Sequence, residues 1–501
     1  MLNRTFRVCS FHLRQALEQP KMLLILLLES IFIYSTTRPV TTFAIAMGMN
    51  VGPWAFPHLT GDFICQLVII CGLVFAFCDA PFENGAHMYI QSRAGEIAWT
   101  FGTCVYIAVM SFLYLSCILI VSILALIPQL NFDSGWGKIW STLARTTAGM
   151  QYGMIIAVND YIIGAYNPIE ATITAFLLEW ACCIWLGLVI YLFNRISGTP
   201  LGCFIAAGFA LLDIAIWNEW SYVFYRISPL TMAQLSAISR PESLYGLSKN
   251  YAISFFVVGI VILTSACIIL PTVKWNKLTL RKGNGYAVDT VLSVRNIVKI
   301  YGQQKVLDNV SLDCEAGKIY GLVGRNGSGK TVLLKCICGL TCPTDGAVYV
   351  LGKQIGRDID FPEHTGFIIE RPGFLLHETG FKNLRYLASI QEKISADQIR
   401  NCMELVGLDP DLKKPVGKYS LGMRQRLGIA QAIMEKPLLL ILDEPTNGLD
   451  NQGIHDIRNL IKGLAKNGVT VILASHSRED IDTLCDTVFR INSGRLCTEA
   501  E

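Results

Sequence analysis

A glycine-rich segment, GRNGSGKT, occupies residues 324–331 and follows the pattern G-x-x-x-x-G-K-[ST]. Glycines in such a loop let successive backbone N–H groups turn inward around phosphate oxygens, and the positive end of a following helix adds to the attraction. We expect Lys330 to neutralise the β- and γ-phosphates of a nucleotide and the Thr331 hydroxyl to ligate Mg²⁺. The predicted phosphate-binding residues are Gly324, Asn326, Gly327, Ser328, Gly329, Lys330 and Thr331.

Two adjacent acids end a second apolar segment, PLLLILDEP, at residues 437–445. Asp443 is placed to hold Mg²⁺ through water, and Glu444 to orient or deprotonate an attacking water. An acid pair after an apolar strand can also be an ordinary strand-to-loop junction. Its presence about 110 residues after the phosphate loop, in one domain, favours nucleotide hydrolysis.

The elements that must position these residues are predicted from the hydrophobic pattern. A strand over 319–323 precedes the phosphate loop and an apolar helix follows it, which is the context that the motif requires. Segments from residue 291 onward alternate or run apolar in the manner of strands. A polar stretch with Gly283 and Gly285 predicts a linker over 276–289, and the nucleotide domain is then 290–501.

Three further segments carry a resemblance to a known family. YSLGMRQRLGIAQAI, residues 419–433, resembles the signature motif of ATP-binding cassette (ABC) proteins and lies shortly before the acidic strand, as in that family. NGLD, residues 447–450, resembles the D-loop, and VILASH, residues 471–476, resembles the switch-histidine strand. The resemblance covers about 290–499 and implies an α/β P-loop NTPase fold that hydrolyses ATP with Mg²⁺.

The signature segment has a physical logic of its own. Ser420 opens a helix whose N-terminus, together with the hydroxyl, can bind an anion. In the family this anion is the γ-phosphate of ATP bound to the other subunit, so two cassettes close head to tail. The resemblance also implies nucleotide contacts by Gly422 and by Asp450 of the D-loop. It implies adenine stacking on Tyr301 and a γ-phosphate contact by His476, which joins Glu444 as a catalytic residue.

The sequence departs from the family pattern at several positions. Leu421 replaces a glycine and Met423 a glutamine of the usual signature, and Glu370 stands where the Q-loop glutamine is expected. A glutamate can still bind Mg²⁺ or organise water, with an added negative charge near the metal. These departures are similar to the bacitracin and lantibiotic self-protection branch of ABC exporters. The predicted metal-binding residues are Thr331, Glu370 and Asp443.

The N-terminal half differs sharply in composition. The whole chain is 52% hydrophobic and 16% charged, against about 25% charged in ordinary soluble proteins. Apolar runs of spanning length begin at Met22 and recur near 62–78, 100–127, 171–193, 201–217 and 252–271. They predict a membrane domain over 1–275 with six spans, preceded by a basic amphipathic stretch at 3–21. The net charge of +3 is too small to indicate a nucleic-acid partner.

Both ends of this domain are predicted to face the cytoplasm, because basic residues flank the first span (Arg4 to Lys21) and the last (Lys274 to Lys282). Glu29, Glu179 and Asp213 occur in or near the spans, and they predict either a pathway for cationic or amphipathic cargo or structural pairing. Glu29 and Arg38 lie on opposite faces of a straight helix and should not pair. The cytoplasmic loop 79–96, in which Pro81 and Asn84 could start a short helix, is a natural place to receive force from the cassette.

Together these observations predict a multi-domain protein: an all-α six-helix transmembrane domain followed by an ABC cassette. The membrane domain resembles the type V exporter fold over about 1–275. We expect a multi-pass protein of the cell membrane, a bacterial plasma membrane in this branch, that works as a dimer, most simply a homodimer of half-transporters. Its cargo would be an amphipathic peptide antibiotic, drug or lipid. The alternative is an ABC-type membrane sensor that moves no cargo. A degenerate ATPase is disfavoured by intact Lys330, Asp443, Glu444 and His476.

Overall fold

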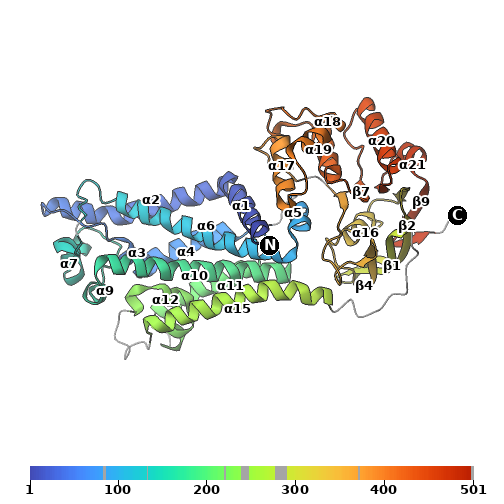
Figure 1. Cartoon of the computed structure of the whole chain (residues 1–501). Coiled ribbons are helices and arrows are strands. Elements are labelled where there is room, and N and C mark those ends of the chain that lie inside the picture. Colours follow the sequence, from blue (N-terminus) through green and yellow to red (C-terminus); the bar gives the residue numbers. More distant parts are fainter. Residues whose placement is uncertain are drawn as a thin grey trace. The chain divides into compact units, whose positions relative to one another are not determined.

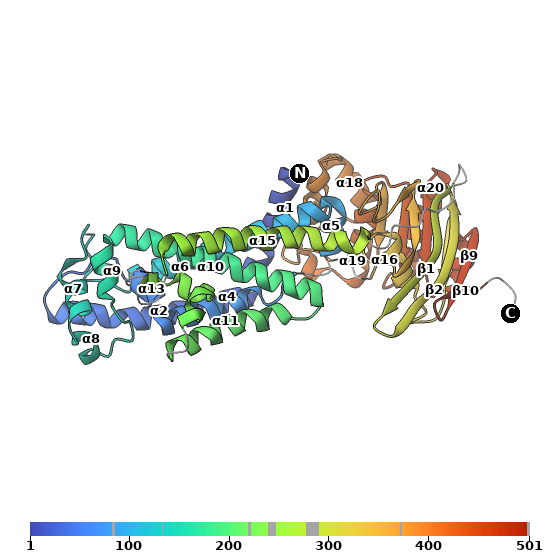
Figure 2. The same cartoon turned by 90° about the horizontal axis from the view of Figure 1, so that it is seen from below.

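The computed structural model (Figures 1 and 2) describes residues 1–82, 86–132, 134–218, 222–238, 247–276, 290–370 and 373–497. The chain divides into two compact units. The helical unit comprises Cys9–Phe82 and Phe101–Ile268, and the cassette unit comprises Met1–Val8, Glu83–Thr100 and Ile269–Glu501. The division is not linear along the chain, because an N-terminal segment and a loop segment belong to the cassette unit. The predicted linker and the basic residues up to Lys282 fall largely on 277–289, outside the described residues.

Six long or apolar helices coincide with the six predicted apolar runs. They are α2 (Pro20–Ala46), α4 (Phe63–Phe77), α6 (Glu96–Leu124), α10 (Pro168–Ser197), α11 (Leu201–Trp217) and α15 (Lys249–Asn276). Within the described residues, four of them (α2, α6, α10 and α15) are long and apolar enough to cross a membrane, whereas α4 and α11 are shorter. The amphipathic stretch is helix α1 (Leu2–Glu18).

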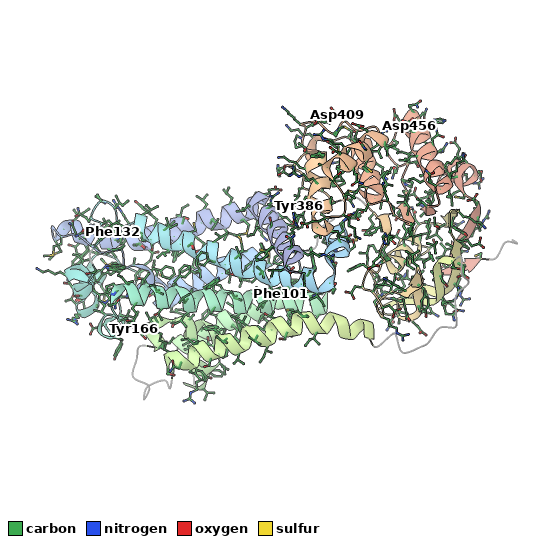
Figure 3. All side chains as sticks on the ribbon, in the orientation of Figure 1. Phe101, Phe132, Tyr166, Tyr386, Asp409 and Asp456 are labelled. Atoms are coloured by element: carbon green, nitrogen blue, oxygen red, sulfur yellow. The ribbon has the colours of Figure 1, made fainter. Side chains whose placement is uncertain are left out.

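Shorter helices complete the helical unit. They are α3 (Phe56–Gly61), α7 (Gly137–Arg145), α8 (Ala148–Gln151), α9 (Asp160–Ala165), η1 (Tyr222–Arg226), α12 (Pro229–Ala233) and α13 (Leu235–Ile238). Large apolar side chains remain exposed along the outer helices, such as Leu24 and Leu28 of α2 and Val258 and Ile262 of α15, and Phe132 is 78% exposed (Figure 3). Such apolar surface is typical of a protein face that contacts lipid.

Two of the three carboxylates predicted in the spans belong to one buried hydrogen-bond network. Gln66 Nε2 donates to Glu179 Oε2 at 3.0 Å, and Gln234 Nε2 donates to Gln66 Oε1 at 2.8 Å. Gln234 Nε2 also donates to Asp213 Oδ2 at 3.2 Å, and the Thr231 hydroxyl donates to Asp213 Oδ1 at 2.6 Å. Both acids are buried, and these partners are neutral amides and a hydroxyl. This network satisfies most of the acceptor atoms of the two acids, as the structural-pairing interpretation expects. The exception is Glu179 Oε1, which has no hydrogen-bond partner among the described residues.

Glu29 lies elsewhere in the core of the helical unit. A Cβ atom added to Gly72 would lie 2.4 Å from Glu29 Oε1 and 2.5 Å from the Tyr114 hydroxyl, so α2, α4 and α6 meet closely at this carboxylate. Arg38, which the helix geometry predicted to be out of reach, donates instead to the carbonyl of Ile127 at 2.6 Å. The prediction that Glu29 and Arg38 do not pair is confirmed.

The cassette unit contains two sheets. One is six-stranded in the order β10-β9-β3-β8-β7-β6 and parallel except for β10, and the other is four-stranded and antiparallel in the order β2-β1-β4-β5. The strands are β1 (Thr290–Tyr301), β2 (Gln304–Glu315), β3 (Ile319–Val323), β4 (Asp345–Val350), β5 (Lys353–Gln354), β6 (Thr365–Ile368), β7 (Leu439–Asp443), β8 (Thr470–Ala474), β9 (Thr487–Asn492) and β10 (Arg495–Cys497). The central strands β3, β7 and β8 are buried almost throughout, as expected of parallel strands covered on both faces.

Helices connect these strands. They are α16 (Lys330–Ile337), α17 (Gly380–Gln391), α18 (Ala396–Leu405), η2 (Val416–Lys418), α19 (Leu421–Ile433), α20 (Asn451–Lys466) and α21 (Arg478–Leu484). Parallel strands joined through helices make an α/β layer, so the fold class predicted for the C-terminal half is confirmed. Ligands of open α/β sheets bind at the carboxyl ends of the strands, which places the site at the ends of β3, β6 and β7.

The short helix predicted in the loop 79–96 is α5 (His87–Ala94), which belongs to the cassette unit. It begins at His87, and Asn84 lies outside the described residues. The Tyr89 ring stacks on Phe367 of β6 with centroids 5.1 Å apart and an interplanar angle of 19°. Arg93 Nε lies 3.1 Å from Glu435 Oε1, and both Tyr89 and Arg93 are buried. This loop segment therefore packs on the cassette through contacts that include an aromatic stack and an ion pair.

Candidate nucleotide site

The phosphate loop lies between β3 and α16 in a conformation that depends on glycine. Gly327 and Gly329 have φ of 78° and 106°, which side chains other than glycine rarely adopt. A Cβ atom at Gly324 would lie 2.3 Å from the carbonyl oxygen of Ile491. Ser328 Oγ is buried and has no hydrogen-bond partner among the described residues. A buried hydroxyl without a partner is costly, and a phosphate oxygen in the loop would satisfy it.

The phosphate loop and the acidic strand meet as the sequence predicts. The buried Lys330 ammonium group donates to the carbonyl oxygens of Gly324 and, at 3.3 Å, of Arg325, so it is held within the loop. The Thr331 hydroxyl donates to Asp443 Oδ2 at 3.1 Å, which joins the first turn of α16 to the end of β7. One lysine, one hydroxyl and one carboxylate thus converge where phosphates and a hard, oxygen-seeking cation can bind.

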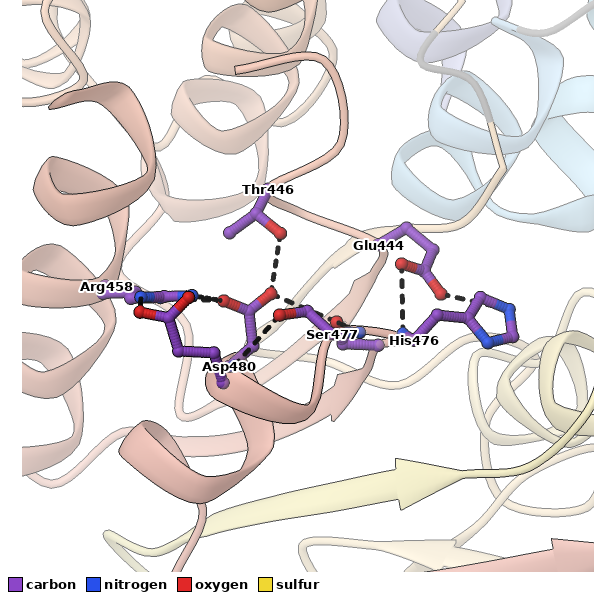
Figure 4. Close-up of polar contacts among 8 residues, drawn as sticks. Glu444, Thr446, Arg458, His476, Ser477 and Asp480 are labelled. Carbon is purple, nitrogen blue, oxygen red and sulfur yellow. Dashed lines mark hydrogen bonds and ion pairs between the residues drawn. The ribbon is translucent and has the colours of Figure 1, made fainter. Parts of the chain in front are cut away.

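Glu444 and His476 lie together at the ends of β7 and β8 (Figure 4). The backbone N–H of His476 donates to Glu444 Oε2 at 3.4 Å, and His476 Nε2 lies 3.5 Å from Glu444 Oε1. Glu444 has a positive φ of 49°, a conformation that costs free energy in residues other than glycine and often marks functional sites. The two predicted catalytic residues are therefore in contact.

A second network behind this pair was not predicted from the sequence (Figure 4). The Thr446 hydroxyl donates to Asp480 Oδ2 at 2.7 Å, and Arg458 makes an ion pair with Asp480 Oδ1. Asp480 is fully buried. Thr446 comes two residues after Glu444, so this network fixes the loop that carries the acid. Its members come from three separate segments, and the sequence offers no spacing that joins them.

Burial changes the acid–base behaviour of the two strand-end acids. Desolvation raises the pKa of Asp443 above its usual value, and the hydrogen bond from Thr331 opposes this effect. Desolvation likewise raises the pKa of Glu444, and the backbone N–H of His476 opposes it. A carboxylate with a raised pKa is a stronger base, which suits Glu444 to accept a proton from water.

A pocket of about 430 Å³ brings most of the predicted site residues together. It is lined by Val306, Arg325, Asn326, Gly327, Ser328, Gly329, Lys330, Thr331, Val332, Glu370, Asp443, Glu444, Asn447 and His476. Its hydroxyl and carboxylate oxygens are the donors that Mg²⁺ prefers, and its lysine and glycine-loop N–H groups suit phosphates. The pocket therefore fits a nucleotide with Mg²⁺. Arg325 and Asn447 are lining residues that the sequence motifs left unassigned.

Glu370 contributes to this pocket in two ways. It follows β6 with a positive φ of 59° and lines the same pocket as Asp443. Its side chain makes an ion pair with Lys335 of α16, with Nζ 2.6 Å from Oε1. The structure thus places Glu370 beside the predicted metal site, while its carboxylate contacts a lysine. Its role as a Mg²⁺ ligand stays a prediction.

The signature residues lie outside the pocket lining. Ser420 is the exposed N-cap of α19, and its hydroxyl accepts from the Met423 N–H at 3.1 Å. A Cβ atom at Gly422 would lie 2.9 Å from the carbonyl oxygen of Gly448, so this glycine permits close contact with the D-loop segment. Asp450 caps α20 by accepting from the Gly453 N–H at 3.1 Å.

Tyr301, the predicted adenine platform, also lies outside the pocket lining, at the end of β1. Its side chain is 49% exposed, and Lys299 Nζ lies 4.8 Å from the ring centroid. An ammonium group over an aromatic face is an attractive cation–π contact. The structure does not bring Tyr301 together with the phosphate-binding residues in one cavity, and its stacking role stays a prediction.

The class of protein follows from the geometry of the site. A phosphate loop after a central parallel strand, with an acidic strand two positions away in the same sheet, defines the cassette unit as a P-loop nucleotide hydrolase.

Comparison with known proteins identifies the family. Residues 307–447 match the family model described as ABC transporter. An uncharacterized ABC transporter ATP-binding protein of Bacillus subtilis, YybJ, is 44% identical over 208 residues, which are 42% of this chain and 95% of that relative. The bacitracin transport ATP-binding protein BcrA of Enterococcus faecalis is 42% identical over 42% of this chain and 70% of that relative. The chain belongs to the ABC transporter family.

Two further proteins are similar to this chain. The lantibiotic transport ATP-binding protein SrtF of Streptococcus pyogenes is 36% identical over 42% of this chain and 91% of that relative. A solved ATP-binding subunit of an ABC transporter is 27% identical, with a TM-score of 0.40 over 42% of this chain and 90% of that one. The resemblance stated from the signature segment and Glu370 is confirmed by the named relatives. The protein is an ATP hydrolase of the ABC type that drives transport.

Proposed function

We propose that this protein is an ATP-driven exporter that works as a dimer and moves an amphipathic substrate, most simply a peptide antibiotic. The observation that carries the proposal is one chain with a complete nucleotide site and a set of apolar helices of membrane-spanning length. The cargo class is supported by relatives named for bacitracin transport and lantibiotic transport. Drugs and lipids of similar amphipathic character are the other members of this substrate class.

The residues of the site divide the work of hydrolysis. Lys330 and the N–H groups of the phosphate loop bind the phosphates, and the buried Ser328 hydroxyl gives them a further donor. Thr331 and Asp443, with Glu370 beside them, would hold Mg²⁺, which supplies Lewis-acid stabilisation of phosphate charge when bound. Glu444 orients a water and accepts its proton, and His476 contacts the γ-phosphate side.

The signature residues support a dimeric arrangement. Ser420 and the N-terminus of α19 are exposed and lie outside the pocket that holds Lys330 and Glu444. A helix N-terminus with a free face attracts an anion, and a second cassette would bring one in its own phosphate loop. Because this chain supplies Lys330, Glu444, Ser420 and His476, a homodimer would have two complete and equivalent sites.

The α5 segment supports a route for force between hydrolysis and transport. The Tyr89 hydroxyl donates to the carbonyl of Ile369 at 3.4 Å, and Ile369 precedes Glu370, which lines the pocket together with Asp443. Arg93 donates to the carbonyl of Gln431 at 3.3 Å, at the end of the signature helix α19. Helix α5 thus contacts both the metal side of the site and the signature helix α19. A movement at either place can be transmitted through α5 to the chain segments on both sides of it.

We further propose six spans, with both ends of the helical domain in the cytoplasm. The two shorter helices have a physical explanation that fits this count. α4 alone is about 22 Å long, short of the roughly 30 Å hydrocarbon core. α3 precedes it directly, and Asp62 between them caps α4 by accepting from the Cys65 N–H at 3.0 Å, so the pair extends over 56–77. α11, with 17 residues, lies at the lower limit for a span. The domain ranges 1–275, 276–289 and 290–501 remain part of this proposal.

Transport in vesicles tests the proposal. The full-length protein is reconstituted into proteoliposomes, and uptake of fluorescent bacitracin or a fluorescent lantibiotic is measured after ATP is added outside, where outward-facing cassettes can use it. We expect ATP-dependent accumulation in the lumen, which corresponds to export from a cell, and none with Glu444→Gln. Vigorous ATP hydrolysis without movement of any peptide, drug or lipid would contradict export and support the sensor alternative.

A further inference from the structure

The glutamate at position 370 occupies a fixed place beside the strand-end acids. It follows β6, which pairs in parallel with β7, the strand that ends at Asp443. The pocket therefore gathers three carboxylates, those of Glu370, Asp443 and Glu444. A nucleotide would add the charge of its phosphates to the same space. An uncompensated third carboxylate would repel those phosphates, because electrostatic effects are strong in a partly desolvated pocket.

Lys335 supplies the compensation for this charge. Its Nζ lies 2.6 Å from Glu370 Oε1, with side chains 25% and 51% exposed. Lys335 follows Thr331 by four residues on α16, so the two lie on one face of the helix. The Thr331 hydroxyl contacts Asp443 at 3.1 Å. Thr331, in one turn of α16, thus contacts Asp443, and Lys335, in the next turn, contacts Glu370.

We infer that Lys335 is a positioning residue of the nucleotide site, which holds the Glu370 carboxylate and cancels its charge. The inference rests on the proposed role of this pocket in ATP hydrolysis. The Lys335–Glu370 pair has no net charge, so it leaves the site with the same net charge as a neutral glutamine without a lysine at position 335. Lys335 therefore makes the glutamate compatible with phosphate binding, and loss of Lys335 should harm the site only while Glu370 is present.

Rescue by a neutral partner tests this dependence. ATP hydrolysis by the full-length protein in nanodiscs is measured for Lys335→Met, Glu370→Gln and the double variant. We expect Lys335→Met to lower kcat/KM about tenfold in the wild-type background, and to change it by no more than about twofold when it is added to Glu370→Gln. Lys382→Met is the matched control, because Lys382 is an exposed residue of α17 that makes an ion pair with Glu378, before this helix, at 2.9 Å. This control should leave the rate unchanged.

The outcomes separate the inference from its competitors. A tenfold loss when Lys335→Met is added to Glu370→Gln would overturn it and assign Lys335 a structural or direct phosphate-binding role. Normal activity of Lys335→Met would overturn it as well. Mg²⁺-dependent binding of a fluorescent ATP analogue, measured on the same variants, must follow the same order, which keeps the test decisive where turnover is slow. Failure of export alone, with the rescue pattern intact, would contradict the proposed cargo movement and leave the role of Lys335 standing.

Discussion

The acidic residues of the cassette unit and those of the helical unit have different surroundings. In the cassette unit, Asp443 and Glu444 line an open pocket together with Lys330 and His476, all of which can act on a ligand. In the helical unit, Glu179 and Asp213 are buried, and the hydrogen bonds they receive come from neutral side chains. An acid in a pocket with a base and a lysine is arranged for chemistry. An acid enclosed by amides and hydroxyls is arranged to join helices.

Replacement of Glu444 by glutamine should have the largest effect. The amide keeps the shape of the side chain and cannot accept a proton, so turnover should fall about a thousandfold or more, while ATP binding persists. Phosphate release by the full-length protein in nanodiscs measures the rate, and Glu404→Gln, an exposed change on α18, is the control. A Glu444→Gln variant with an ordinary rate would remove Glu444 from the role of base.

Loss of the Tyr89 ring should have the next largest effect. Tyr89 is 1% exposed and stacks on Phe367, and removal of a buried aromatic ring costs about 3–5 kcal/mol of packing. Tyr89→Ala should therefore lower ATP-dependent uptake into proteoliposomes about tenfold or more while ATP binding is retained. Tyr89→Phe keeps the stack and removes only the contact to Ile369, so its uptake should fall less than that of Tyr89→Ala. Equal transport by wild type and Tyr89→Ala would exclude α5 as the transmitting segment.

Replacement of the buried Glu179 by glutamine tests the comparison of the two units from the side of the helical unit. Glu179→Gln can still accept from Gln66, so we expect transport within about twofold of the wild type. Glu179→Ala leaves the Gln66 amide without this acceptor and should lower the free energy of unfolding by about 1–3 kcal/mol, measured by thermal unfolding. The exposed Glu170→Gln on the same helix is the control. A folded Glu179→Gln variant that moves no cargo would instead assign this acid to the pathway.

The smallest expected effect is a shift in the pH profile of hydrolysis. Burial raises the pKa of Glu444 above the ordinary glutamate value of 4.5. The base acts when deprotonated, so activity is present above this raised pKa and is lost as the pH falls through it. The acidic limb of kcat/KM should therefore lie above pH 4.5. A limb at or below this value would contradict the proposed environment of Glu444.

The sequence predicted the site well where function rests on contiguous motifs. Gly324 to Thr331 and the Asp443–Glu444 pair carry their geometry in local backbone, and the parallel sheet brings the two segments together by topology. Pairings between side chains that are far apart in the sequence could not be predicted. The contact of Lys335 with Glu370 depends on how β6 is placed beside α16, and no local pattern encodes it.

The helical unit was predicted less completely for a related reason. Apolar runs locate helices, because burial in lipid needs little more than hydrophobicity, and α2, α6, α10 and α15 follow the predicted runs closely. The same runs say nothing about which helix faces meet. The bridge from Glu179 through Gln66 and Gln234 to Asp213 joins residues from four segments. The run predicted near 62–78 corresponds to α4 alone, and Asp62 separates it from α3, which the apolar runs did not predict.

The most direct test of the central claim asks whether cargo at the helical unit controls hydrolysis in the cassette unit. ATP hydrolysis by the full-length protein in lipid nanodiscs is measured while bacitracin, a lantibiotic, cationic peptides and lipid-like drugs are titrated, with Glu444→Gln beside the wild type. We expect saturable stimulation by one of these classes in the wild type and no hydrolysis in the variant. Hydrolysis that persists in Glu444→Gln, or a wild-type rate that no member of any class alters, would contradict the claim.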